Sequence, residues 1–337
     1  MLLSFCIATY NRSSVIMELV ETLLSIESEE FEVVVVDDCS TDDTQACLAG
    51  IEDKRLRVVQ NRKNQGSIMN IYRAIDAGQG EYLFYLNDRD GVKKYKILPL
   101  IKILKELKNQ DVAFARCDSE LSLGAQYQVF ESGEAAIVEF ACRITHPTGY
   151  IFKKTTWKEM AKKKVFFSDE KYGDYPTANL CAVLAKRYNG ARILGDICNA
   201  NYERIDFKQV KSGYYKNRKD KRLWYTPEVS VRELNIAVKL MRSLNIETPI
   251  IMRTILFRFA EYMRRDVNLW YVIASQPSNS YHYGVAPPKK NFWKPIRNGL
   301  YIYKETDKIL KKYYPAKLYR NELREITKNT MDAYRKQ

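Results

Sequence analysis

The chain of 337 residues is 46% hydrophobic and 28% charged, a balance that excludes intrinsic disorder and allows one large domain with a smaller one, or two medium domains. No apolar run reaches the roughly 18 residues of a membrane-spanning helix, and the seven cysteines form no CxxC or Cys/His cluster, so we expect free thiols in a reducing compartment and a cytoplasmic protein. The net charge is +14, and its basic excess lies in residues 201–337, which contain 29 Lys and Arg against 13 Asp and Glu.

Residues 2–116 alternate short apolar runs with amphipathic segments. The apolar runs predict strands at 2–8, 31–36, 56–60, 81–86 and 112–115. Periodic apolar residues predict a helix capped by Ser13 or Ser14, a helix after the acidic segment 40–43, and helices at 67–77 and 97–107. Strands that alternate with helices indicate an α/β fold with a mainly parallel, doubly wound sheet, which binds ligands at the carboxyl ends of its strands.

The rest of the chain has a mixed pattern followed by a helical one. We predict a strand at 150–153 and helices at 177–187, 231–244 and 249–264, with one or two further helices in 301–337. Loops are predicted at 211–222, which is basic and polar, and at 275–290, which holds three prolines. The sequence therefore predicts an α/β domain at 1–205 and a basic, mostly helical region at 206–337.

Four polar segments follow the predicted strands or open a helix in the first 116 residues. They are residues 9–12 (TYNR), 36–42 (VDDCSTD), 64–70 (NQGSIMN) and 87–90 (NDRD). Because the carboxyl ends of parallel strands share one edge of a sheet, we expect these segments to lie together.

The residue types in these segments suit a nucleoside diphosphate. Tyr10 can stack on a base, a contact of about 1–3 kcal/mol in nucleic-acid complexes, and Asp38 can accept hydrogen bonds from a base or a ribose. The carboxylates of Asp88 and Asp90 can hold Mg²⁺ or Mn²⁺ against a diphosphate, because these cations prefer oxygen ligands.

These segments resemble the family 2 glycosyltransferases of the GT-A fold. Residues 4–12 match the family's S-x-x-x-x-T-Y-N-R start, residues 35–44 match V-V-D-D-x-S-x-D-x-T, and Asn64, Gly66 and Asn70 match its N-x-G helix. The resemblance is dense over 2–116, which it implies to be a donor half, and loose over 145–205, within an acceptor half at 117–205. It implies an inverting hexosyltransferase that transfers one sugar from a nucleotide sugar, most commonly a UDP-sugar, to a glycan, glycolipid or glycoprotein hydroxyl.

The resemblance also implies site residues. The donor would contact Thr9, Tyr10, Arg12, Asp38, Asn64, Gly66, Asn70 and Asp88. Aligned without a gap, the family's D-x-D-D would place Asn87 and Arg89 at acidic positions, whereas a shift of one residue makes Asp88-Arg89-Asp90 a D-x-D motif. We favour the shifted alignment, with Asp88 and Asp90 as ligands of Mn²⁺ or Mg²⁺. The alternative is a metal-free site in which Arg89 and other basic groups balance the diphosphate.

The acceptor side is implied more weakly. Residues 146–152 resemble the segment that lines the acceptor cleft, which implicates His146 and Gly149. An inverting transfer needs a carboxylate that removes the acceptor's proton. Asp174, which precedes the predicted helix at 177–187, is the residue that matches the family, and Asp169 and Glu170 are the alternatives.

The basic region suggests an anionic partner. We expect either an anionic membrane surface, which would make the protein peripheral on the inner face of a membrane, or a phosphate-bearing acceptor. No nucleic acid is expected, because RNA-recognition signatures are absent from the sequence. The alternative function is an inactive nucleotide-binding module whose basic region holds an anionic partner.

Overall fold

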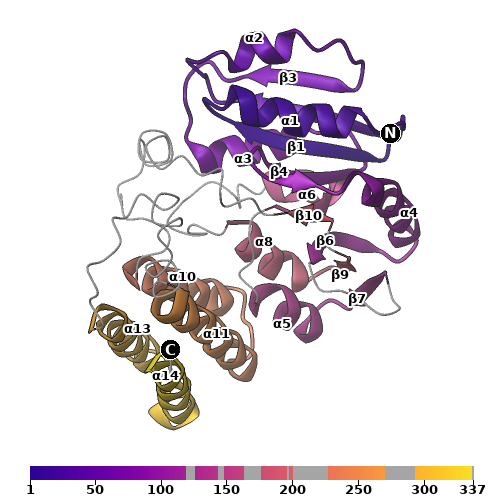
Figure 1. The fold of residues 1–337 in the computed structure, drawn as a ribbon. Coiled ribbons are helices and arrows are strands. Elements are labelled where there is room, and N and C mark those ends of the chain that lie inside the picture. The colour runs from indigo at the N-terminus through magenta and orange to yellow at the C-terminus, as the bar shows by residue number, and fades with distance from the viewer. Residues whose placement is uncertain are drawn as a thin grey trace. The chain divides into compact units, whose positions relative to one another are not determined.

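The computed structural model describes residues 1–118, 126–142, 148–162, 176–195, 197–199, 227–269 and 293–335. The chain divides into two compact units. The first contains the β-sheets with helices α1–α4 and α6, whose bounds are given below. The second contains most of α5 (Glu134–Cys142) and α8 (Pro176–Ala185) together with the C-terminal helices (Figure 1). The predicted loops at 211–222 and 275–290 lie outside the described residues.

Eight strands of the described residues form one mixed sheet. The strands are β1 (Leu3–Thr9), β2 (Phe31–Asp37), β3 (Leu56–Gln60), β4 (Tyr82–Asn87), β6 (Val112–Asp118), β7 (Tyr127–Phe130), β8 (Tyr150–Lys153) and β9 (Asn189–Leu194). Their order is β3-β2-β1-β4-β8-β6-β9-β7. The neighbours β3, β2, β1 and β4 are parallel, as are β6 and β9, whereas β8 is antiparallel to β4 and β6, and β7 to β9. The predicted α/β fold with a mainly parallel sheet is confirmed.

A second sheet pairs two short strands. These are β5 (Gly91–Val92), which follows the acidic segment after β4, and β10 (Cys198–Asn199), and they run antiparallel. Lys93 N also donates to Ile197 O at 2.9 Å. These bonds fix the chain directly after Asp90 and so limit the positions that the acidic segment can take.

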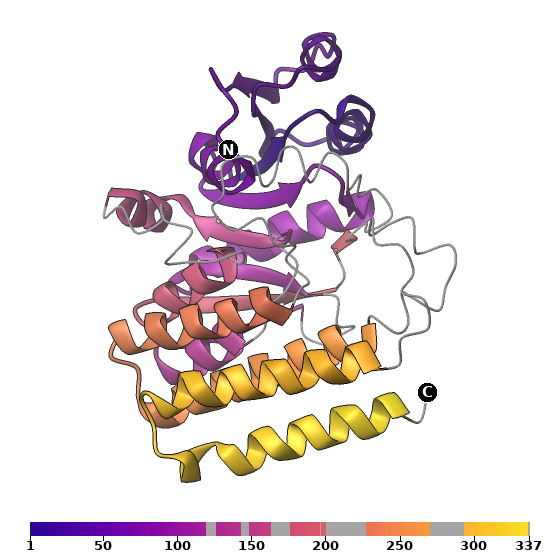
Figure 2. The ribbon, with the colours of Figure 1, turned by 90° about the vertical axis from the view of Figure 1, so that its left-hand side faces the viewer.

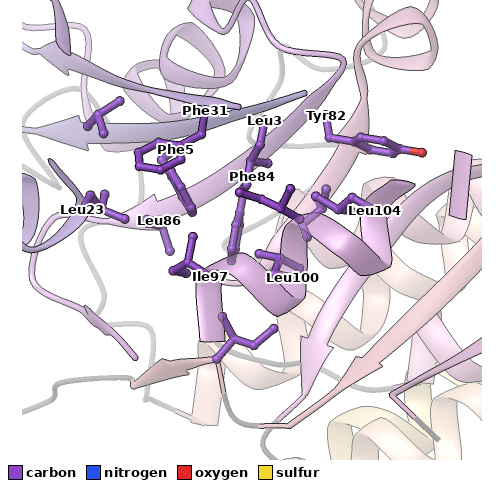
Figure 3. Close-up of a cluster of buried hydrophobic side chains, with 14 of the residues drawn as sticks. Leu3, Phe5, Leu23, Phe31, Tyr82, Phe84, Leu86, Ile97, Leu100 and Leu104 are labelled. Atoms are coloured by element: carbon purple, nitrogen blue, oxygen red, sulfur yellow. The ribbon is translucent and has the colours of Figure 1, made fainter. Parts of the chain in front are cut away.

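One face of the large sheet is covered by α1 (Ser13–Leu24) and α4 (Ile97–Lys108). Every second side chain of a strand points to this face. Phe5, Phe31 and Phe84, from β1, β2 and β4, pack here with Leu23 of α1 and Leu100 of α4 (Figure 3). Each fully buried aliphatic or aromatic side chain of this kind contributes about 1.5–3 kcal/mol. This core anchors the strand ends that carry the polar segments.

The opposite face is covered by α3 (Ser67–Ala77) and α6 (Lys154–Lys162). Tyr72 of α3 lies 6.1 Å from Trp157 of α6 between ring centroids, and Phe152 of β8 lies 5.4 Å from the same indole. Trp157 Nε1 donates to Asp76 Oδ1 at 3.2 Å, so the buried indole keeps a polar partner. The sheet is therefore covered on both faces, as a doubly wound fold requires.

The described residues from 227 onward contain four long helices of the second unit. They are α10 (Pro227–Ser243), α11 (Thr248–Met263), α13 (Trp293–Lys311) and α14 (Arg320–Arg335). They pack alongside one another (Figure 2) around a core that includes Leu234, Phe259, Ile302 and Leu323. The predicted helical C-terminal region is confirmed, although α10 and α13 begin earlier than the periodicity predicted.

One local expectation is wrong. The predicted cap of α1 by Ser13 or Ser14 does not form, because the helix begins at Ser13 with Arg12 as its N-cap residue and without a side-chain capping bond. Instead, Ser13 N lies 3.4 Å from Asp42 Oδ2 in the segment after β2. A group distant in the sequence serves the helix end where a local serine was expected.

Candidate functional site

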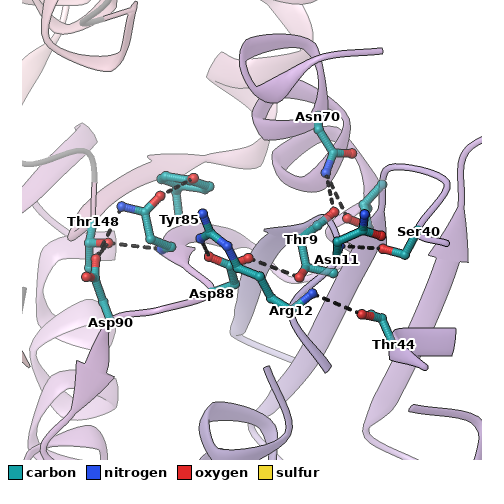
Figure 4. A network of polar contacts seen from close by, with 12 residues as sticks. Thr9, Asn11, Arg12, Ser40, Thr44, Asn70, Tyr85, Asp88, Asp90 and Thr148 are labelled. Atoms are coloured by element: carbon teal, nitrogen blue, oxygen red, sulfur yellow. Dashed lines mark hydrogen bonds and ion pairs between the residues drawn. The ribbon is translucent and has the colours of Figure 1, made fainter. Parts of the chain in front are cut away.

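The polar segments at the carboxyl ends of β1, β2 and β4 meet, as predicted, and hydrogen bonds join them (Figure 4). Asn70, in the second turn of α3, donates from Nδ2 to Thr9 O at 3.1 Å and to Val36 O at 3.0 Å. Its Oδ1 accepts from Asn61 Nδ2 at 2.9 Å. Asn70 is 2% exposed, so its amide locks the ends of β1 and β2 together from within the fold.

Asp38 organises the turn that opens α3. Its Oδ1 accepts from Asn61 Nδ2 and from Gln65 N, both at 2.8 Å, and its Oδ2 accepts from Gly66 N at 2.9 Å. Gly66 N also lies 3.0 Å from Asn64 Oδ1. Gly66 has φ 86° and ψ 156°, a conformation that is essentially limited to glycine. The carboxylate thus holds a glycine-dependent turn at the predicted donor site.

Arg12 and Asp88 form an ion pair within the rim, the name used here for the hydrogen-bonded residues at the carboxyl ends of β1, β2 and β4. Arg12 Nη1 lies 2.6 Å from Asp88 Oδ1, and Thr9 Oγ1 donates to Asp88 Oδ2 at 3.0 Å. The side chain of Asp88 is 6% exposed and that of Arg12 is 17% exposed. A pair this well shielded from water interacts more strongly than an exposed one, because solvent screens it less.

The loop that carries Arg12 is held by the segment after β2. Arg12 N donates to Thr44 Oγ1 at 3.1 Å, at the start of α2 (Thr44–Ala49), and Asn11 N donates to Ser40 Oγ at 2.8 Å. Asn11 adopts φ 52°, a left-handed conformation that asparagine tolerates better than most residues. Tyr10 is half-buried directly after β1. The backbone of this loop is therefore tied to the second strand, and the Arg12 guanidinium extends from a fixed base.

Asp90 lies in a second polar cluster after β4. Its Oδ2 accepts a short hydrogen bond from Thr148 Oγ1 and a longer one from Asn87 Nδ2 at 3.3 Å. Asn87 N donates to Thr148 Oγ1 at 3.0 Å, and Tyr85 Oη donates to Asn87 Oδ1 at 2.7 Å. Burial, followed by the negative charges of Asp88 and Asp90, raises the pKa of Tyr85 well above its ordinary value of 10.0. The phenol therefore stays protonated and remains a hydrogen-bond donor at neutral pH.

Gly149 connects this cluster to the middle of the sheet. Gly149 N donates to Tyr85 O at 3.0 Å, and Cys117 N donates to Gly149 O at 2.8 Å. Gly149 has φ +99°, and an added Cβ would lie 3.4 Å from that of Cys117. This backbone conformation favours glycine at this position, and the predicted place of Gly149 in the acceptor cleft stays a prediction.

Asp88 and Asp90 have the chemistry that a hard divalent cation requires, since both are carboxylates. Both are buried, and each accepts hydrogen bonds from this chain. A carboxylate has about four lone-pair positions, and Arg12 and Thr9 each take one on Asp88. No group of three or more His, Cys, Asp and Glu side chains is placed to hold a metal in the described part of the chain. As donor groups, the two carboxylates suit a cation whose remaining ligands would come from phosphate and water.

The structure brings together most of the predicted donor residues and adds two. Asn61, which is 3% exposed, bonds to Asp38 and Asn70, and Thr148 bonds to Asp90. The sequence could have predicted Asn61 as a site residue, because it is polar and directly follows β3, just as other residues of the site follow strands. Asp174, with its alternatives Asp169 and Glu170, and His146 lie outside the described residues.

The sheet order and the helices on both faces of the sheet agree with the GT-A fold that the sequence predicted. Residues 4–158, a little under half of the chain, match the family model described as Glycosyl transferase family 2.

Two curated relatives match part of the chain. The chain is 30% identical over 133 residues to the succinoglycan biosynthesis protein ExoO of Rhizobium meliloti, an alignment that covers 40% of this chain and 38% of ExoO. It is 33% identical over 89 residues to the UDP-Glc:alpha-D-GlcNAc-diphosphoundecaprenol beta-1,3-glucosyltransferase WfaP of Escherichia coli, covering 26% of this chain and 36% of WfaP. The chain thus matches well under half the length of each relative.

A solved structure extends the likeness in fold. The crystal structure of S. aureus TarS aligns with 99% of this chain and 54% of its own, with a TM-score of 0.54 and 18% sequence identity. At this identity the likeness concerns the fold alone. Among the helices that the structure describes, none is long and apolar enough to cross a membrane.

Proposed function

We propose that this protein transfers one sugar from a nucleotide-sugar donor to a hydroxyl group of a saccharide acceptor. The observation that carries the proposal is the buried network at the ends of β1, β2 and β4, in which Asp38, Asn70 and Asp88 hold three loops in place. Because these groups are already ordered, ligand binding does not incur the entropy cost of ordering the loops.

The donor is proposed to be a UDP-sugar whose base lies against Tyr10. WfaP, by its name, uses UDP-Glc and makes a beta linkage, which supports a uridine donor for this chain. In this arrangement the diphosphate lies near Arg12, whose positive charge offsets part of the negative charge of the phosphates.

A divalent cation would be held by Asp88 and Asp90 together with the diphosphate. When bound, such an ion neutralises charge that builds on the leaving diphosphate. Arg12 and Thr9 orient the Asp88 carboxylate, and Thr148 orients that of Asp90. Asp90→Asn is expected to lower turnover more than it lowers stability, and full activity in excess EDTA would contradict the metal.

Asp174 is proposed as the base that removes the proton from the acceptor hydroxyl, which then attacks the anomeric carbon and expels the nucleoside diphosphate. A direct displacement inverts the anomeric configuration. Asp174→Asn cannot accept the proton and should reduce turnover about 10²–10⁴-fold with donor affinity unchanged. Rate measurements on Asp174→Asn, with Asp169→Asn as the matched control, and NMR assignment of the product anomer test the base and the inversion separately.

The acceptor is proposed to be a lipid-linked saccharide at an anionic membrane surface. One face of α13 presents a regular exposed stripe: Arg297, Tyr301, Lys304, Lys308 and Lys311. Next to it, Leu300 is 44% exposed. A basic face that also exposes apolar side chains matches the interface of an anionic bilayer. WfaP acts, by its name, on a diphosphoundecaprenol-linked sugar, which supports this class of acceptor.

Vesicle binding tests this surface. A basic residue near an anionic membrane contributes about 1 kcal/mol, so the double variant Lys304→Glu/Lys311→Glu should bind anionic vesicles at least about tenfold more weakly. The control Lys102→Glu/Lys239→Glu changes the charge equally at exposed positions on α4 and α10. Equal binding of the two variants, or equal partitioning onto neutral and anionic vesicles, would contradict the membrane surface.

The transfer itself is tested with a panel of nucleotide sugars. The purified protein should show a thermal shift with one class of donor and should release the nucleoside diphosphate when a saccharide acceptor is added. If no nucleotide sugar or nucleoside diphosphate binds, and the protein instead retains nucleic acid or phospholipid at low salt, the proposed function is wrong.

A further inference from the structure

The Arg12–Asp88 ion pair has a consequence for the order in which ligands bind. Both oxygens of Asp88 already have partners, Arg12 Nη1 at 2.6 Å and Thr9 Oγ1 at 3.0 Å. Of these two partners, only Arg12 is positively charged. A divalent cation that approaches Asp88 therefore meets a competing guanidinium, whose charge repels it.

We infer that Arg12 is a latch that withholds Asp88 from a divalent cation until the donor diphosphate draws the guanidinium away. The inference rests on the proposed function, because it requires a nucleoside diphosphate at this rim. A diphosphate offers Arg12 a stronger anionic partner than one carboxylate does, and guanidinium groups bind phosphate oxygens in bidentate geometry. Asp88 is then available to the cation, which contacts the same diphosphate.

The movement requires only the side chain of Arg12. Its backbone is held by the hydrogen bond to Thr44, and Asn11 is held by Ser40. The Arg12 side chain is 17% exposed whereas that of Asp88 is 6% exposed, so the arginine is the partner with access to solvent and to an incoming ligand. Thr9 keeps its bond to the other oxygen of Asp88, so the carboxylate stays in position when Arg12 leaves.

If Arg12 competes with the cation for Asp88, removing the charge of Arg12 should strengthen metal binding. In the absence of nucleotide, Arg12→Gln should bind Mn²⁺ roughly tenfold more tightly than the wild type, because a charge-assisted hydrogen bond no longer competes. Arg12→Lys keeps the charge and should stay close to the wild type. Arg62→Gln, which removes the same charge from an exposed position between β3 and α3, is the matched control and should not change Mn²⁺ affinity.

The readout is the electron paramagnetic resonance signal of free Mn²⁺, titrated with each protein with and without UDP. In the wild type UDP should tighten Mn²⁺ binding, and by linkage Mn²⁺ should tighten UDP binding by the same factor. In Arg12→Gln that factor should fall, because the free protein already binds the ion. Circular dichroism melts establish that each variant is folded. If Arg12→Gln is not, the wild type alone still tests the latch, because Mn²⁺ binding that UDP does not tighten would contradict it.

The outcomes separate the latch from the proposed function. If UDP binds but Arg12→Gln binds Mn²⁺ no more tightly than the wild type, or if Mn²⁺ binds to neither protein even with UDP, the latch is wrong and nucleotide binding stands. If Arg12→Lys binds Mn²⁺ as tightly as Arg12→Gln, charge competition is not the cause and the latch is also wrong. If no nucleoside diphosphate or nucleotide sugar binds, the proposed function fails as well.

Discussion

Removing the Asp38 carboxylate should release the turn that opens α3. Its two oxygens accept from Asn61 Nδ2, Gln65 N and Gly66 N at 2.8–2.9 Å, and the residue is 2% exposed. Each buried donor that loses its acceptor costs about 1–3 kcal/mol. Gly66 N retains Asn64 Oδ1 at 3.0 Å, and Asn61 retains Asn70, so the full penalty falls mainly on Gln65 N. We therefore expect Asp38→Ala to lower the free energy of unfolding by about 1–3 kcal/mol.

Binding of a nucleoside diphosphate should weaken in the same variant. A turn that is no longer held by Asp38 must be ordered when the ligand binds, and contacts made by Asp38 itself are lost, so affinity should fall by about 1–3 kcal/mol. Asp38→Asn keeps the shape but replaces one acceptor by a donor, and both effects should be intermediate. Urea unfolding gives the stability, and calorimetry with UDP on folded protein gives the affinity.

The matched control is Asp43→Ala. Asp43 is exposed at the N-terminus of α2 and makes no side-chain capping bond, so its replacement should change stability by less than about 0.5 kcal/mol. If Asp38→Ala unfolds at the same urea concentration as this control, the carboxylate does not hold the turn. If its affinity for UDP is also unchanged, Asp38 has no place in the donor site.

Three further predictions follow from conformation and burial. Gly66→Ala should destabilise the protein by about 1–3 kcal/mol in urea unfolding, because φ 86° with ψ 156° is strained for any residue with a Cβ. Alkylation with iodoacetamide followed by mass spectrometry should label Cys39 before the buried Cys6 and Cys181, since burial raises the pKa of the Cys6 thiol. The free energy of unfolding should fall as pH rises above about 9. Burial raises the pKa of the Cys6 thiol and raises the pKa of Tyr82 to about 12, so both groups release their protons more readily in the unfolded chain. An unchanged free energy of unfolding at about pH 10 would contradict this.

The strands and helices of residues 2–116 were predictable because their signals are local. The apolar runs of β1 and β2 and the periodicity of α3 depend on neighbouring residues, and α3 occupies the predicted residues Ser67–Ala77. The polar segments were located for the same reason, since each follows a strand in a fold whose strand ends meet.

The partners within the site were not predictable from local patterns. Thr148 bonds to Asp90 across 58 residues of sequence, and Arg12 bonds to Asp88 across 76, so only the folded sheet identifies either pair. The same reason explains the wrong cap of α1, because the competing Asp42 belongs to another strand's loop. In the C-terminal region, α13 starts at Trp293, before the residues whose periodicity had suggested a helix.

The bonds at the rim link loops that could otherwise vary independently. Asn70 joins the ends of β1 and β2, Asp38 joins the end of β2 to the start of α3, and Asp88 joins β1 to the segment after β4. Fixing a loop costs about 1–2 kcal/mol per residue in backbone entropy, and here the fold meets that cost before any ligand arrives. In the proposed latch, binding free energy from the nucleotide displaces Arg12, which is paired with Asp88 in this structure. Ordered loops that carry a movable Arg12 side chain would therefore make diphosphate and metal binding depend on each other.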